Sequence, residues 1–199
     1  MFFKQIFIGA ALLCASAAQA ATVFSDNFDT DTLALNAVNF NGGWAVSGGT
    51  VDIIGAGGSF DLVPGNGRYV DLDGSTNKAG IFANALSVVG GQSYTLSFAL
   101  AGNHRNAGTD TVEVNFGGAS QVFTRAAGDA FTTYTLNYTA TATGKAGFSF
   151  LDKGGDNQGA LLDRVTVATA AAPVPEPASY GMLLGGLAML GLVARRRQG

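Results

Sequence analysis

The sequence predicts an all-β fold, an antiparallel β-sandwich of the jelly-roll type, with an N-terminal signal peptide and a C-terminal single hydrophobic helix. Apolar and polar residues alternate with a period of two through most of the central part, and pairs of glycines separate the alternating runs. No run between Thr22 and Thr169 has a helical period. About ten short strands with turns at this spacing are typical of sandwiches and jelly rolls.

Each alternating run divides its side chains between two faces, because successive strand residues point to opposite sides of a sheet. Large apolar residues mark one face of most runs, and small polar residues mark the other. The clearest runs are 94–100, 112–116, 134–138, 148–150 and 161–167.

The pattern along the chain divides it into four parts. We expect a signal peptide at 1–20, a β-sandwich domain at 21–169, a Pro/Ala linker with a sorting motif at 170–177, and a hydrophobic helix with an arginine-rich tail at 178–199.

The N-terminus has the order of a secretory signal peptide. Lys4 precedes the apolar stretch 6–13, and Ala18-Gln19-Ala20 forms an A-x-A cleavage site. We expect export through the translocon and cleavage by signal peptidase after Ala20; the alternative is a buried N-terminal helix. Cys14 would leave with the peptide, so the mature chain would carry no thiol chemistry.

The C-terminus combines three signals in order. Val174-Pro175-Glu176-Pro177 gives an extended entry, residues 180–194 are apolar, and Arg195, Arg196 and Arg197 form a stop that stays in the cytoplasm. Fifteen apolar residues span roughly 22 Å, against a hydrocarbon core of about 30 Å. The run therefore favours a shallow or temporary anchor over a permanent one.

This tail resembles a PEP-CTERM sorting signal over residues 173–199. The resemblance implies export in a Gram-negative bacterium and recognition by an exosortase-type membrane protease. It also implies cleavage near Pro175-Glu176-Pro177 and release to the cell surface or exopolysaccharide matrix. The alternative is a plain tail anchor.

The charge of the central part limits the partners. Between residues 21 and 172, seven lysines and arginines face thirteen aspartates and glutamates. This acidic balance argues against nucleic acid, which needs basic patches.

Few residues point to catalysis. The chain has one histidine and no H-E-x-x-H, G-x-S-x-G or P-loop motif. Two carboxylates suffice for glycoside hydrolysis, but nothing in the sequence gives one pair of aspartates different pKa values. We therefore expect no enzyme, and keep a secreted glycoside hydrolase as an alternative.

Residues 44–167 resemble DUF642 and related galactose-binding-like jelly rolls, which often serve as carbohydrate-binding modules. The resemblance rests on the segments 65–74, 91–98, 101–103 and 162–167. It implies the fold, and sugar binding only as an option.

One carboxylate is a candidate metal ligand. Asp163 has the parity of Leu161, Val165 and Val167, so it is expected to point with apolar side chains, and a buried carboxylate needs a cation or several hydrogen bonds. In jelly rolls of this kind the first and last strands often lie together, which would bring Asp26 and Asp29 near it. We expect either a structural Ca²⁺ held by these carboxylates or an Asp163 paired with loop amides or an arginine.

Candidate ligand-binding residues are Trp44, Tyr69, Asn103, His104 and Arg105. Trp44 is the only tryptophan and can stack on a sugar, but a place in the core is an equal alternative. The 103–105 segment follows a strong strand at an end of the sandwich, where loops carry function; a solvated hairpin loop is its alternative.

The favoured function is that of a non-catalytic surface or matrix protein with carbohydrate contact. A specific carbohydrate-binding module is the first alternative, and a secreted hydrolase the second.

Overall fold

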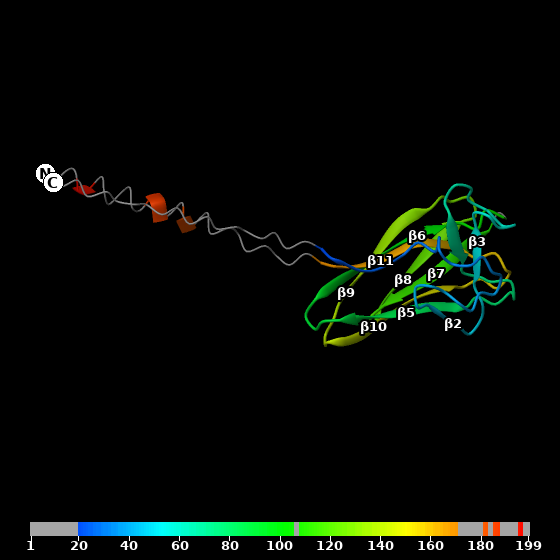
Figure 1. The fold of residues 1–199 in the computed structure, drawn as a ribbon, viewed down its shortest axis with the longest axis horizontal. Helices are drawn as coiled ribbons and strands as arrows, with labels where there is room; N and C mark the ends of the chain where they lie inside the picture. The colour runs from blue at the N-terminus through cyan, green and yellow to red at the C-terminus, as the bar shows by residue number, and fades with distance from the viewer. Residues whose placement is uncertain (1–19, 106–107, 171–180, 183–184, 188–194, 197–199) are drawn as a thin grey trace. The chain divides into compact units, whose positions relative to one another are not determined.

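Two antiparallel sheets face each other in the computed structural model, which describes residues 20–105, 108–170, 181–182, 185–187 and 195–196 (Figure 1). No helix occurs within 20–105 and 108–170. The predicted all-β antiparallel sandwich is therefore confirmed. Its strands are β1 (Thr22–Asp26), β2 (Ala45–Ser47), β3 (Asp52–Gly55), β4 (Arg68–Asp71), β5 (Ile81–Val88), β6 (Ser93–Ala101), β7 (Thr109–Phe116), β8 (Ala119–Ala126), β9 (Thr132–Thr139), β10 (Gly144–Asp152) and β11 (Leu161–Thr169).

The strand order contains the crossovers of a jelly roll. The first sheet has the order β3-β4-β11-β6-β9, and β1 also pairs with β11. The second sheet has the order β2-β5-β10-β7-β8. The first and last strands of the sandwich therefore lie side by side, with Thr22 opposite Ala168.

Phenylalanines from both sheets fill the space between them. Phe98 comes from the first sheet, and Phe82, Phe148 and Phe150 come from the second; each is at most 1% exposed. On β6 the buried face also contains Tyr94, Leu96 and Leu100, as the alternation predicts.

A bulge in β11 places Asp163 and Val165 on opposite faces of the strand, although the sequence pattern groups them on one face. The pairing of β11 with β6 shifts register between Asp163 and Thr166, and Arg164 has a φ of +49°. An extra residue at a bulge moves the following side chains to the opposite face. Val165 and Val167 therefore pack in the core between the sheets, whereas Leu161 packs in a second cluster with Tyr69.

The sandwich has two poles, which β6 connects. At one pole the Ala170 amide donates to the Ser93 carbonyl, 2.8 Å away, where the described sandwich ends. At the other pole Ala101 pairs with Leu161. Eight strand rises separate Ser93 from Ala101, or about 26 Å.

Residues 20–170 form one compact unit. The predicted signal peptide lies outside the described residues, apart from Ala20. So do Val174, Pro175, Glu176, Pro177 and Arg197; Arg195 and Arg196 are helical. Among the described residues, no helix is long and apolar enough to cross a bilayer, and the predicted division of the chain into four parts stays a prediction.

Candidate functional site

Three adjoining hollows surround Leu35 at the pole opposite Ala170. One, of 270 Å³, has apolar walls that include Leu33, Leu35, Ile54 and Phe60. A second, of 40 Å³, shares Leu35, Ile54 and Phe60, and its other walls are Asp52, Asp71, Ser75, Arg105 and Asn157. A third, of 440 Å³, is formed by residues 31–32 and 34–41 alone. We call the first two together the polar-apolar cleft.

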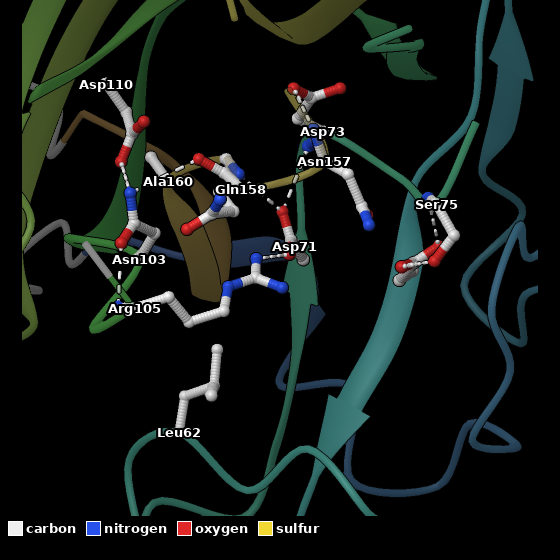
Figure 2. Close-up of polar contacts among 12 residues, drawn as sticks. Leu62, Asp71, Asp73, Ser75, Asn103, Arg105, Asp110, Asn157, Gln158 and Ala160 are labelled. Carbon is white, nitrogen blue, oxygen red and sulfur yellow. Dashed lines mark hydrogen bonds and ion pairs between the residues drawn. The ribbon is translucent and has the colours of Figure 1, made fainter. Parts of the chain in front are cut away.

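Asp71 is the most buried charged group of this cleft. It lies at the end of β4 and is 0% exposed. One carboxylate oxygen accepts from the Asp73 and Gly159 amides at 3.1 and 3.0 Å, and the other binds the Arg105 guanidinium (Figure 2). Burial raises the pKa of Asp71 to about 8, although the Arg105 charge acts in the opposite direction.

Gly159 allows this network to close. A Cβ at Gly159 would stand 2.4 Å from the Asp73 amide nitrogen and 2.9 Å from an Asp71 carboxylate oxygen. Such distances exclude a side chain, so glycine is required by the close approach of the two segments.

Two further aspartates fasten the loop between β10 and β11. Asp73 accepts from the Asp156 and Asn157 amides at 2.9 and 3.1 Å, and Asp152 accepts from Gly154 and Ala160. Burial raises the pKa of Asp152. These carboxylates hold loop backbone in place, which is a structural task.

The predicted 103–105 segment lies at this pole, but its residues differ in exposure. Asn103 is 1% exposed and donates to Asp110 at 3.0 Å and to the Gln158 carbonyl at 3.3 Å. His104 is exposed, with a φ of +54°. Arg105 is partly exposed, and its side chain crosses toward Asp71 (Figure 2). Of the three, Arg105 is the one that reaches the cleft.

Asp110, the partner of Asn103, is 8% exposed on β7. Burial raises its pKa to about 6, and the neighbouring charge of Asp152 adds to the shift. Asp110 and Asp71 thus have raised pKa values, but their oxygens are bound to Asn103, Arg105 and backbone amides. The hydrogen bonds of both carboxyl groups are thus to protein donors.

Trp44 occupies the core, which was the alternative to a sugar platform. It is 6% exposed and stacks on Phe82 with ring centroids 4.1 Å apart and an interplanar angle of 8°. Its indole nitrogen donates to Asp26 at 2.8 Å. Both faces and the polar edge of this ring are therefore turned toward protein.

Tyr69 is also buried, at 0% exposure. Its hydroxyl accepts from the Leu62 and Val63 amides at 2.6 and 2.9 Å. Those two residues belong to the loop that carries Phe60. Tyr69 therefore holds that loop by hydrogen bonds from the protein interior, and its ring is not accessible to a ligand.

The three candidate calcium ligands have protein partners. Asp163 accepts from the Asn66 side chain at 3.0 Å and from the Arg164 amide at 2.6 Å, and its carboxylate pairs with the Arg164 guanidinium. Burial raises the pKa of Asp163.

Asp26 and Asp29 are similarly engaged. Asp26 accepts from Trp44 and from the Phe28 amide, and Asp29 accepts from Asn27 and from the Arg68 amide. Among the described residues, no group of three or more His, Cys, Asp or Glu side chains is arranged to hold a metal ion. Asn66 and Arg164 are thus the partners of Asp163 in this geometry, and the structural Ca²⁺ stays a hypothesis.

Four residues of the cleft were not predicted from the sequence: Leu35, Phe60, Ser75 and Asn157. Phe60 follows Gly57-Gly58-Ser59, but the buried Trp44 likewise follows Gly42-Gly43, so this pattern does not separate an exposed ring from a buried one. The other three come from separate segments, and only the folded chain shows that they line one cleft.

Residues 173–197 carry a PEP-CTERM protein-sorting motif. No curated protein matches the chain.

Several solved structures share the fold of the sandwich. The CBM22-1 xylan-binding domain from Paenibacillus barcinonensis Xyn10C is 14% identical with a TM-score of 0.52, over 79% of this chain and 99% of that domain. The CBM22-1–GH10 modules of a Clostridium thermocellum endo-1,4-β-D-xylanase, complexed with xylohexaose, match at 15% identity and a TM-score of 0.50.

An arabinose-bound α-L-arabinofuranosidase matches at 12% identity and a TM-score of 0.52, over 78% of this chain. This chain spans only 29% of the xylanase structure and 27% of the arabinofuranosidase. At these identities the likeness establishes the fold: the sandwich is similar to carbohydrate-binding jelly rolls.

Proposed function

We propose that this chain is an exported, non-catalytic protein of the cell surface or extracellular matrix, whose β-sandwich contacts polysaccharide. The observation that carries the proposal is the combination of a PEP-CTERM motif at 173–197 with a sandwich like that of a xylan-binding domain. The motif supplies the destination, and the fold supplies a scaffold for carbohydrate contact.

The route follows from the two termini. The translocon exports the chain and signal peptidase cleaves after Ala20. The apolar tail then holds the chain in the inner membrane until an exosortase-type protease cuts near Pro175-Glu176-Pro177. The apolar run 180–194 is shorter than a typical membrane-spanning helix, which favours a transient anchor.

A non-catalytic role is supported by the state of the carboxylates. Glycoside hydrolysis needs two carboxyl groups that face one substrate. Asp71 and Asp110 are buried and bound to protein donors. A specific carbohydrate-binding module is the second candidate, favoured by the exposed ring of Phe60 at the cleft.

Cell fractionation with intact-mass analysis tests the destination. We expect the protein outside the cell, without residues 1–20 and without the residues beyond about Pro177. Glu176→Ala should leave an uncut chain in the inner membrane, while Ala171→Ser, a change outside the matched residues 173–197, should be processed normally. An intact tail on wild-type protein in the inner membrane would overturn the sorting claim.

A further inference from the structure

Phe60 forms an apolar platform at the polar-apolar cleft. It is 44% exposed, the greatest exposure of any Phe, Tyr or Trp among the described residues, and Leu35 beside it is 50% exposed. Sugar rings present C–H faces that pack on such apolar surfaces, while a few placed polar groups fix their orientation. A hollow of 270 Å³ lined by these side chains has room for about one sugar ring.

Polar groups line the adjoining part of the cleft. Arg105 is 22% exposed along its side chain, and Asn157 extends between Asp71 and Ser75 (Figure 2). Arg105 Nε and Asn157 Oδ1 are buried atoms without a hydrogen-bond partner in the structure. One is a donor and the other an acceptor, and unsatisfied buried groups of this kind cost free energy that a ligand hydroxyl can recover.

The charge of the cleft points to a neutral ligand. Among the described residues that line the cleft, Arg105 is the one cation; its guanidinium is bound to Asp71, and Asp52 adds a second carboxyl group to the wall. A uronic acid or other anionic sugar would therefore have to displace Asp71 from Arg105 and approach the Asp52 carboxylate. Hydroxyl groups, by contrast, can pair with both the donors and the acceptors present.

The position of the cleft favours the end of a sugar chain. The cleft lies at the pole opposite Ala170, about 26 Å away along β6. On the outer face of the second sheet, the central positions hold the small residues Ala83, Ala85, Gly147 and Ser149, which offer no ring for stacking along an extended chain.

We propose that the polar-apolar cleft binds the end of a neutral saccharide, with Phe60 stacked on one sugar ring and with Arg105, Asn157 and Ser75 hydrogen-bonded to its hydroxyls. This site rests on the proposed contact with polysaccharide and names where that contact occurs.

Calorimetric titration of the full chain in mild detergent tests the site. The probes are xylo-, gluco- and galacto-oligosaccharides, with an oligouronate as the anionic comparison. Wild-type protein should bind at least one neutral oligosaccharide more tightly than the oligouronate. Phe60→Ala should weaken that binding about tenfold or more, and Phe60→Tyr, which keeps the ring, should retain it.

Val89→Ala is the matched control, because Val89 is 61% exposed at the pole near Ala170; it should bind like wild type. Equal binding by wild type and a folded Phe60→Ala variant overturns the site and leaves the polysaccharide contact standing. Tighter binding of the oligouronate overturns the neutral class. Absence of binding to every probe overturns both the site and the proposed contact with polysaccharide.

Discussion

Trp44 and Phe60 each stand beside an aspartate, but the protein covers one ring and leaves the other open. Trp44 is packed on Phe82 and tied to Asp26, with 6% exposure. Phe60 lies on a loop at the cleft, with 44% exposure, near the Asp71–Arg105 pair. The difference teaches that tertiary packing, and not the residue type, decides which aromatic side chain is available to a ligand.

Truncation of Trp44 should have the largest effect on stability. Trp44→Ala removes a ring that contacts Phe24, Phe28, Phe82, Phe148 and Phe150, and we expect a loss of about 3–5 kcal/mol in the free energy of unfolding, measured in urea. Phe60→Ala should lose less than about 1 kcal/mol. If the two losses were equal, the contrast between a core ring and an open ring would fail.

The buried carboxylates near the cleft should make stability fall as pH rises. The pKa of Asp110 is about 6 in the folded protein and about 3.9 when unfolded. Between these pH values the folded state binds more protons, so this stability is fully present below pH ~4 and is lost as pH rises through ~6.

The size of this effect is on the order of 3 kcal/mol. Asp110→Asn should flatten the decline between pH ~4 and ~6, as measured by thermal melts across that range. Asp71, with a pKa of about 8, should continue the decline at higher pH. A wild-type melting temperature that rises from pH 4 to pH 6, with Asp110→Asn following the same curve, would contradict this account.

Asp163 provides a test at the edge of the aromatic core. Asp163→Ala leaves the Asn66 amide and the Arg164 amide without their acceptor, and we expect a loss of about 1–3 kcal/mol in the free energy of unfolding. Because these partners are protein groups, EDTA should not change the melting temperature of wild type. A drop on chelation that is absent in the variant would instead support the calcium hypothesis.

The smallest effect should come from the ion pair between Lys153 and Glu113 on the outer face of the second sheet. Their charged atoms are 2.6 Å apart, and Lys153 lowers the pKa of Glu113. Such exposed pairs are screened by salt and contribute little. Lys153→Ala should leave the urea midpoint within error of wild type at physiological salt. A clear shift of the midpoint would show that this exposed ion pair stabilises the fold, which would contradict the prediction.

The sequence predicted the sandwich because alternation is a local signal. Tyr94, Leu96, Phe98 and Leu100 share a buried face in the sequence pattern and in the structure. The bulge at Arg164 was not predictable, because a non-glycine residue at φ +49° has no distinctive pattern. Asp163 is buried, as its parity predicted, but because of this bulge it does not share the face of Val165 and Val167.

The candidate site could be predicted only in part. Arg105 was identified because a polar loop after a strong strand is visible in the sequence. Phe60, Ser75 and Asn157 come from three other segments. They line one cleft because of the order in which the strands pair within the sheets, which the sequence pattern does not show. The exposure of Trp44 was left open for the same reason, since burial is a property of the folded chain.

NMR titration of the full chain with a neutral oligosaccharide that it binds is the most direct test of the account. The account predicts shift changes centred on Phe60, Leu35, Arg105 and Asn157, with the Trp44 indole signal unchanged. Shift changes centred on Trp44, or on the outer face of either sheet, would contradict it.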